Sequence, residues 1–137
     1  MLKITKEILY AKSNIYVLRH ILGKNHPDGT HQACENWLQV EIAKKLSRDY
    51  DIVRMEVGEN NHDITFLEED LKIAVEIKFW KKSDRDISKI RESLSHKNID
   101  EGYLLVISSS EIQGKEGKSG QIIKEDKFIN IYSEKYK

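Results

Sequence analysis

The run LKIAVEIKFW at residues 71–80 constrains this chain more than any other segment, because it has the composition and alternation of a buried β-strand. Side chains alternate between the two faces of a strand, so the odd-numbered positions from Ile73 to Phe79 form one wholly apolar face. Glu76 and Lys78 lie together on the other face, about 7 Å apart along the strand. A strand of this kind is expected inside a sheet, so its two charged groups need partners or a function.

The composition predicts one folded domain with a highly charged surface. The chain has 137 residues, of which 39% are hydrophobic and 34% are charged. Lys plus Arg and Asp plus Glu both number 23, so the formal net charge is zero. Bulk charge therefore gives no argument for a nucleic-acid partner, and any binding face must come from local segregation of charge.

The distribution of cysteine and of apolar residues predicts a soluble, cytoplasmic protein without a membrane partner. Cys34 is the only cysteine, which rules out an intramolecular disulfide and fits a reducing compartment. The first fourteen residues, MLKITKEILYAKSN, carry charges every few positions and lack the apolar run of a signal peptide. No window approaches the roughly 18 apolar residues of a membrane span.

Periodicity predicts an α/β domain with a central mixed β-sheet flanked by helices. Helices are expected over 5–22, 31–48 and 84–98, and strands over 52–57, 63–67, 71–79, 103–108 and 128–132. The first three strands read as an antiparallel meander, and the apolar run YLLVIS at 103–108 as a central strand parallel to an earlier one. The organisation is a helical N-terminal extension (1–30), a core (31–108), and a basic loop with a final strand (109–137).

Two further carboxylates are placed to join Glu76. Asp63 opens the strand before it, so a hairpin can bring the two acids together, although the register is open. On the helix 31–48, Glu35 falls at roughly 60°, inside the stripe that runs from Leu38 to Leu46 at about 0–80°. A carboxylate on a core-facing stripe is costly unless it is paired or binds a metal.

These residues resemble the active-site pattern of the PD-(D/E)XK nuclease superfamily, which has the restriction-endonuclease-like fold. The matching elements are Glu35 in ENWLQVEIAKKL, Asp63 in NHDITF, and Glu76 and Lys78 in VEIKFW. The spacing is especially similar to that of small archaeal Holliday-junction resolvases, and the resemblance covers residues 31–108. His62 stands where the family name has proline, and this histidine reads as a turn residue in GENNH.

The resemblance implies a metal-dependent endonuclease that hydrolyses phosphodiester bonds, with DNA as the expected substrate. Asp63, Glu76 and the backbone carbonyl of Ile77 would bind Mg²⁺ or Mn²⁺, with Glu35 completing the shell directly or through water. Lys78 would position the attacking water and offset phosphate charge. Nucleic-acid contacts are expected from Trp80, Lys81, Lys82, Lys115 and Lys118. Many small members act as dimers, so a homodimer is expected, with the N-terminal helices as its interface.

Other functions remain open from the sequence. One is a structure-specific Holliday-junction resolvase, and another is a catalytically silent nucleic-acid-binding or interaction module of the same fold. A zinc site at His26, His31 and Cys34 has no standard spacing. The loop GKEGKSG at 114–120 lacks the first glycine of a nucleotide-binding loop, since Ile112 stands there.

Overall fold

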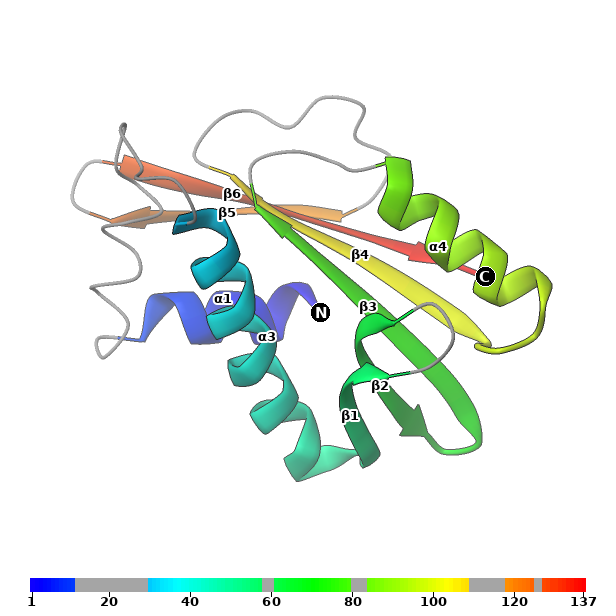
Figure 1. Ribbon diagram of the computed structural model, residues 1–137. Helices are drawn as coiled ribbons and strands as arrows, with labels where there is room; N and C mark the ends of the chain where they lie inside the picture. Colours follow the sequence, from blue (N-terminus) through cyan, green and yellow to red (C-terminus); the bar gives the residue numbers. More distant parts are fainter. Residues whose placement is uncertain (12–29, 58–60, 80–83, 109–117, 125–126) are drawn as a thin grey trace.

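The computed structural model describes residues 1–11, 30–57, 61–79, 84–108, 118–124 and 127–137 (Figure 1). The helices are α1 (Leu2–Tyr10), α3 (Thr30–Asp49) and α4 (Asp84–Ser95). The strands are β1 (Asp51–Val57), β2 (His62–Glu68), β3 (Leu71–Phe79), β4 (Glu101–Ser108), β5 (Lys118–Lys124) and β6 (Lys127–Tyr136). The described elements follow one another as α–α–β–β–β–α–β–β–β, so the expected α/β class is confirmed.

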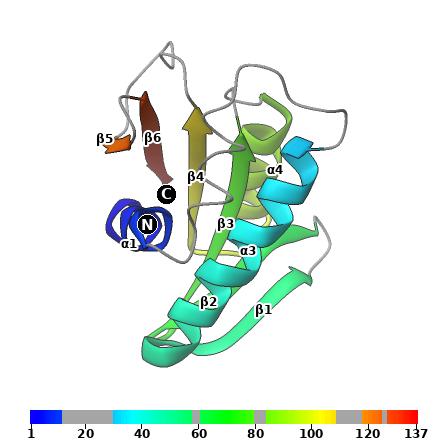
Figure 2. The same cartoon turned by 90° about the vertical axis from the view of Figure 1, so that its left-hand side faces the viewer.

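The six strands form one mixed sheet in the order β1-β2-β3-β4-β6-β5. β3 and β4 run parallel, and every other pair of neighbours runs antiparallel. α4 is the crossover that returns the chain from β3 to β4, which is the connection that parallel neighbours require. α3 covers one face of the sheet and α4 covers the other, as Figures 1 and 2 show.

The two faces of β3 belong to two separate core clusters. Ile73, Val75, Ile77 and Phe79 pack with apolar residues of α1 and α3 on one face. Ala74 packs on the other face with Ile87 and Ile90 of α4 and with residues of β4 and β6. The predicted alternation is therefore confirmed, and Glu76 and Lys78 are directed to the α4 side.

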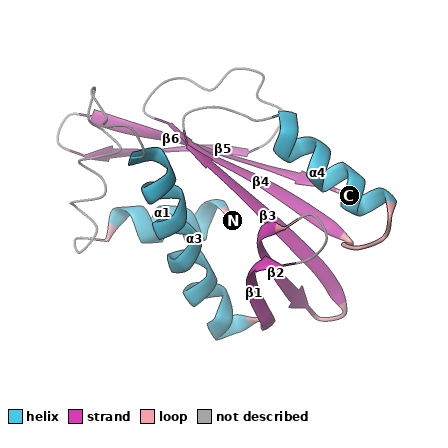
Figure 3. Ribbon diagram, in the orientation of Figure 1, coloured by secondary structure: helices cyan, strands magenta, loops and turns pink. Residues whose placement is uncertain are grey.

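The predicted position of β4 is confirmed, and the prediction for the C-terminal segment is wrong in part. Residues 104–108 of β4 are all buried, between β3 and β6. The loop expected at 110–121 gives way to β5 at Lys118, and the expected charged tail belongs to β6, which continues to Tyr136 (Figure 3). Backbone pairing explains the longer strand, because Tyr136 is the partner of Gly102 at the start of β4.

The sequence predicts one or two helices over 5–22, and α1 (Leu2–Tyr10) is the helix that the structure describes there. Residues 12–29, which include the remainder of the predicted segment, lie outside the described residues. Ile8 and Leu9 are buried in the core beside α3, so these two apolar side chains are not available for the expected dimer interface. Among the described helices, none has the length and apolarity needed to cross a bilayer.

Helix α4 packs closely against the sheet at Gly102 of β4. A Cβ atom added at Gly102 would lie 2.3 Å from Cγ2 of Ile90, well inside van der Waals contact. Ile90 is fully buried, and its branched side chain is stiff at χ1. The absence of a side chain at position 102 therefore lets α4 rest on the sheet.

We expect Gly102→Ala to lower the free energy of unfolding by roughly 1–3 kcal/mol, because the added methyl group overpacks the α4–β4 contact. Urea denaturation monitored by circular dichroism measures this change. Ser88→Ala, on the exposed side of α4, is the matched control and should leave the midpoint unchanged. Equal midpoints for Gly102→Ala and wild type would show that α4 does not pack at this distance.

Candidate active site at the carboxylate pair of β2 and β3

The β2–β3 hairpin brings Asp63 beside Glu76. A two-residue turn joins the strands, and Glu69 in that turn has φ 56°. The register that follows ends with Ile64 opposite Val75, so Asp63 and Glu76 are the next residues on the facing strands. The charge of Glu76 acts on Asp63, so the two carboxyl groups lie close together where the pairing ends.

Asp63 is held by backbone groups at the point where the hairpin pairing stops. Its Oδ2 accepts a hydrogen bond of 2.8 Å from the backbone N–H of Ile77. Its own backbone carbonyl accepts a hydrogen bond of 2.7 Å from Nε2 of Gln39 on α3. These two contacts fix Asp63 between β3 and α3.

The electrostatic environment of Asp63 favours its protonated form. Burial raises its pKa to about 7, and the charge of Glu76 adds to the rise. The amide of Ile77 and the charge of Lys89 act in the opposite direction and only in part offset the rise. Burial and the neighbouring Glu76 together therefore outweigh the groups that favour an ionised Asp63.

Glu76 is 1% exposed and has two cationic or polar partners. Its Oε1 lies 2.6 Å from Nδ1 of His62 and 3.1 Å from Nζ of Lys89. Lys89 also donates to the backbone carbonyl of Asn61 over 3.5 Å.

The prediction of His62 as a turn residue is wrong. His62 begins β2, is 3% exposed, and bridges the sheet to α4, because its Nε2 lies 2.7 Å from Oγ of Ser93. Asn61 precedes it with φ 49°, a left-handed conformation that asparagine tolerates well. The sequence offers one signal for this contact with α4. Lys89 and Ser93 are spaced i, i+4, so they lie on one side of the helix, beside the buried Ile90.

Ser93, His62 and Glu76 follow one another in the order of a nucleophile, a base and an orienting acid. Ser93 is 1% exposed, so its hydroxyl offers no surface to a substrate. The three residues therefore form a structural clamp between β2, β3 and α4, which we call the His62 clamp.

Glu35 and Lys78 each contact a residue other than Asp63 and Glu76. Oε1 of Glu35, on α3, accepts a hydrogen bond of 3.2 Å from the backbone N–H of Phe79. Nζ of Lys78 lies 3.7 Å from Oδ2 of Asp86 in the first turn of α4. Within the described residues, no contact joins Glu35 or Lys78 to Asp63 or Glu76.

Four of the five residues expected to contact nucleic acid, Trp80, Lys81, Lys82 and Lys115, lie outside the described residues. The fifth, Lys118, is the first residue of β5, which is an edge strand of the sheet. The expected basic loop is therefore a strand from this position onward.

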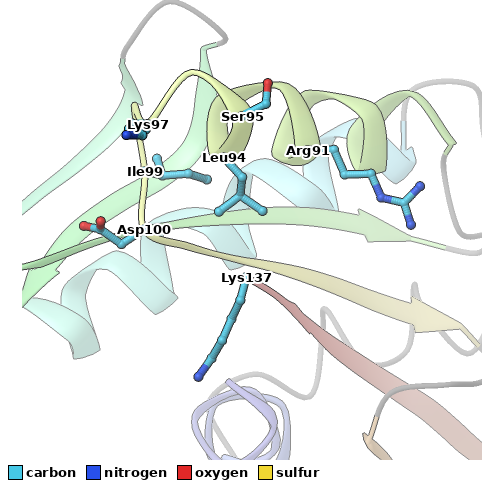
Figure 4. A pocket seen from close by; sticks show the side chains of 7 residues that line it. All are labelled: Arg91, Leu94, Ser95, Lys97, Ile99, Asp100 and Lys137. Carbon is cyan, nitrogen blue, oxygen red and sulfur yellow. The ribbon is translucent and has the colours of Figure 1, made fainter.

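A separate hollow of about 590 Å³ lies at the C-terminal end of α4. It is lined by Arg91, Leu94, Ser95, Lys97, Ile99, Asp100 and Lys137 (Figure 4). In Figure 4, Leu94 and Ile99 lie side by side, and the charged side chains extend around them. None of the residues of the carboxylate pair or the His62 clamp lines this hollow.

The carboxylate pair offers the ligand chemistry that a hard divalent cation prefers. Asp63 and Glu76 supply adjacent carboxylate oxygens, and their mutual repulsion is what a cation would relieve. The described residues contain no group of three or more His, Cys, Asp or Glu side chains arranged to hold a metal. Asp63 and Glu76 are two such side chains, so a cation held here would take its remaining oxygen ligands from backbone carbonyls and water.

A scan of the chain against protein-family models finds no match, and a search of curated protein sequences finds no significant match. The function is therefore inferred from the residues and from their geometry.

We expect His62→Ala to lower the free energy of unfolding by roughly 2–4 kcal/mol, because Glu76 then stays buried with one polar partner fewer. Thermal and urea unfolding measure this loss. His96→Ala removes an exposed imidazole just beyond α4 and is the matched control, with no expected change. A His62→Ala variant as stable as wild type would mean that the clamp contributes nothing to the docking of α4.

The raised pKa of Asp63 predicts a pH dependence of stability. The folded protein keeps this proton up to about pH 7, whereas an ordinary aspartate loses it near 3.8. The folded state therefore binds the extra proton between these values, and stability falls as the pH rises through that window. Asp63→Asn should lack this fall, because its amide stays neutral and can still accept from Ile77 and donate to Glu76.

The difference in unfolding free energy, Asp63→Asn minus wild type, should grow by roughly 2–4 kcal/mol between about pH 4.5 and about pH 8. Urea titrations at several pH values measure it. Asp70→Asn, in the exposed β2–β3 turn, should show no such growth. Parallel profiles for Asp63→Asn and wild type would mean that Asp63 is ionised throughout the window.

Proposed function

We propose that this protein is a metal-dependent endonuclease that hydrolyses phosphodiester bonds in DNA. The observation that carries the proposal is the meeting of Asp63 and Glu76 on adjacent strands, where burial and the charge of Glu76 raise the pKa of Asp63. Paired acids of this kind at one end of a hairpin are a functional arrangement more than a stabilising one, since they cost folding energy.

The order of elements supports the same proposal. α3, the meander β1-β2-β3, the crossover helix α4 and the parallel strand β4 stand in the order on which the resemblance to PD-(D/E)XK nucleases rests. The restriction-endonuclease-like fold is part of the proposal. Glu35 reaches the C-terminal end of β3 from α3, where the resemblance expects a helical acid.

In the proposed reaction, water attacks the phosphorus atom. A new P–O bond forms to the water oxygen, the P–O bond to the leaving sugar breaks, and the leaving oxygen takes up a proton. A bound Mg²⁺ or Mn²⁺ would supply positive charge at the phosphate and lower the pKa of the attacking water. Asp63 and Glu76 would hold the cation, and a lysine beside them would offset the charge of the phosphate.

A second candidate is a catalytically silent module that binds nucleic acid or protein. The observation that favours it is the engagement of Glu76, which is buried and already contacts both His62 and Lys89. A silent module has no use for a cation at this position. Manganese would then leave its melting temperature unchanged, whereas a bound cation stabilises the folded state by mass action.

We expect wild-type protein to cut DNA in Mg²⁺ or Mn²⁺, and Asp63→Asn to lose that cutting by roughly 10²-fold or more, because one of two metal ligands is removed. The assay offers supercoiled plasmid, linear duplex, single strand, RNA and a four-way junction. Asp70→Asn is the matched control and should cut as wild type does. Preference for the four-way junction would identify a Holliday-junction resolvase.

Equal cutting by wild type and Asp63→Asn would assign the activity to another site or to a contaminant. Failure of wild type to cut any substrate, together with an unchanged melting temperature in Mn²⁺, would favour the silent module. The proposed homodimer is tested in the same preparation by sedimentation, since two sites are needed to cut both strands of a duplex.

A further inference from the structure

Two lysines, Lys78 and Lys89, lie near the carboxylate pair, and the structure separates their roles. We propose that Lys89 on α4, and not Lys78 on β3, is the lysine that contacts the scissile phosphate. This inference rests on the proposed function. It changes the residue that the resemblance assigns to this role, because the spacing in VEIKFW points to Lys78.

The distances distinguish the two ammonium groups. Nζ of Lys89 lies 3.1 Å from Oε1 of Glu76, within hydrogen-bonding range for a charged pair. Nζ of Lys78 lies 3.7 Å from Oδ2 of Asp86, a carboxylate of α4 outside the pair. Lys89 is therefore the lysine that contacts the carboxylate pair. Lys78, on the same face of the sheet, is paired with Asp86 instead.

Helix α4 fixes Lys89 in place. Ile90 follows it and is fully buried against Gly102, while Ser93, one turn later, contacts His62. The helix is thus anchored directly after Lys89 by packing, and one turn further on by the His62 clamp. An ammonium on an anchored helix is preorganised, so little reorganisation is needed when a charged substrate arrives.

Lys89 has the exposure that substrate contact requires. Its side chain is 25% exposed and that of Lys78 is 36% exposed, so exposure permits substrate contact by either lysine and the choice between them rests on the ion-pair distances. An ammonium carries three N–H donors. One meets Glu76 and another is directed to the carbonyl of Asn61, over a longer distance of 3.5 Å. The remaining donor capacity serves a non-bridging phosphate oxygen.

The test compares Lys89→Met with Lys78→Met in the magnesium-dependent cleavage assay. We expect Lys89→Met to lower kcat by roughly 10²–10³-fold, the usual effect of removing one preorganised donor from a developing charge. The loss in Lys78→Met should be at least tenfold smaller. Lys44→Met, an exposed lysine of α3, is the neutral control.

Lys89→Arg separates catalysis from folding. The arginine keeps a positive charge beside Glu76, so this variant should fold even where Lys89→Met does not. A role in folding alone predicts full activity for Lys89→Arg. Direct contact with the phosphate predicts partial recovery, with kcat lowered and KM little changed, because the planar guanidinium places its donors differently.

A second measurement does not depend on cutting. Binding of a short DNA duplex in Ca²⁺, in place of Mg²⁺, is followed by fluorescence anisotropy. Lys89→Met should weaken this binding at least tenfold relative to Lys78→Met. The reverse order, in cleavage or in binding, would overturn the assignment of Lys89 while leaving the endonuclease in place. A wild-type protein that neither cuts nor binds DNA would overturn both proposals.

Discussion

The buried charge of Glu76 is the constraint on which the arrangement around β3 depends. β3 lies in the middle of the sheet, and Glu76 is almost completely covered by α4. An ionised carboxylate in such a place is tolerated only with partners at close range. His62 of β2 and Lys89 of α4 supply these partners. Glu76 therefore links β2 and α4, which are distant in the sequence, to β3.

This requirement explains why α4 docks as it does. Ile87 and Ile90 give the helix an apolar contact with the sheet, but apolar contact is not directional. Lys89 and Ser93 lie one turn apart and meet Glu76 and His62, which fixes both the rotation and the position of the helix. Because these contacts are short-range and directional, they specify what packing alone leaves loose.

The fold was predictable from the sequence where one period dominated. The alternation in LKIAVEIKFW placed β3, and the apolar run at 103–108 placed a central parallel strand. β5 was missed because its first residues, KSG, are of types common in turns and at the surface. Its strand conformation comes from pairing with β6. Pairing between distant segments is a tertiary effect that no local pattern shows.

The candidate site was predictable to the extent that local geometry determines it. The short turn at Glu69 sets the register that brings Asp63 to Glu76, and strand parity places Lys78 on the same face. The alternation of side chains along a strand gives the face on which a residue lies, but not the residue that it contacts. It therefore could not distinguish Lys78, which meets Asp86, from Lys89, which meets Glu76. His62 was missed for the same reason, since its role depends on where a helix thirty residues later comes to lie.

The partners of Asp63 and Glu76 differ in charge, and this difference distinguishes the two carboxylates of the proposed site. Glu76 has an ammonium and an imidazole beside it, whereas Asp63 has a backbone amide and only the more distant influence of Lys89. Burial raises the pKa of Asp63, the charge of Glu76 adds to the rise, and Lys89 offsets only part of it. The uneven distribution of partners therefore distinguishes the two acids: Glu76 is held by the His62 clamp and Lys89, whereas Asp63 has fewer charged partners and would be the more responsive ligand of the cation proposed above.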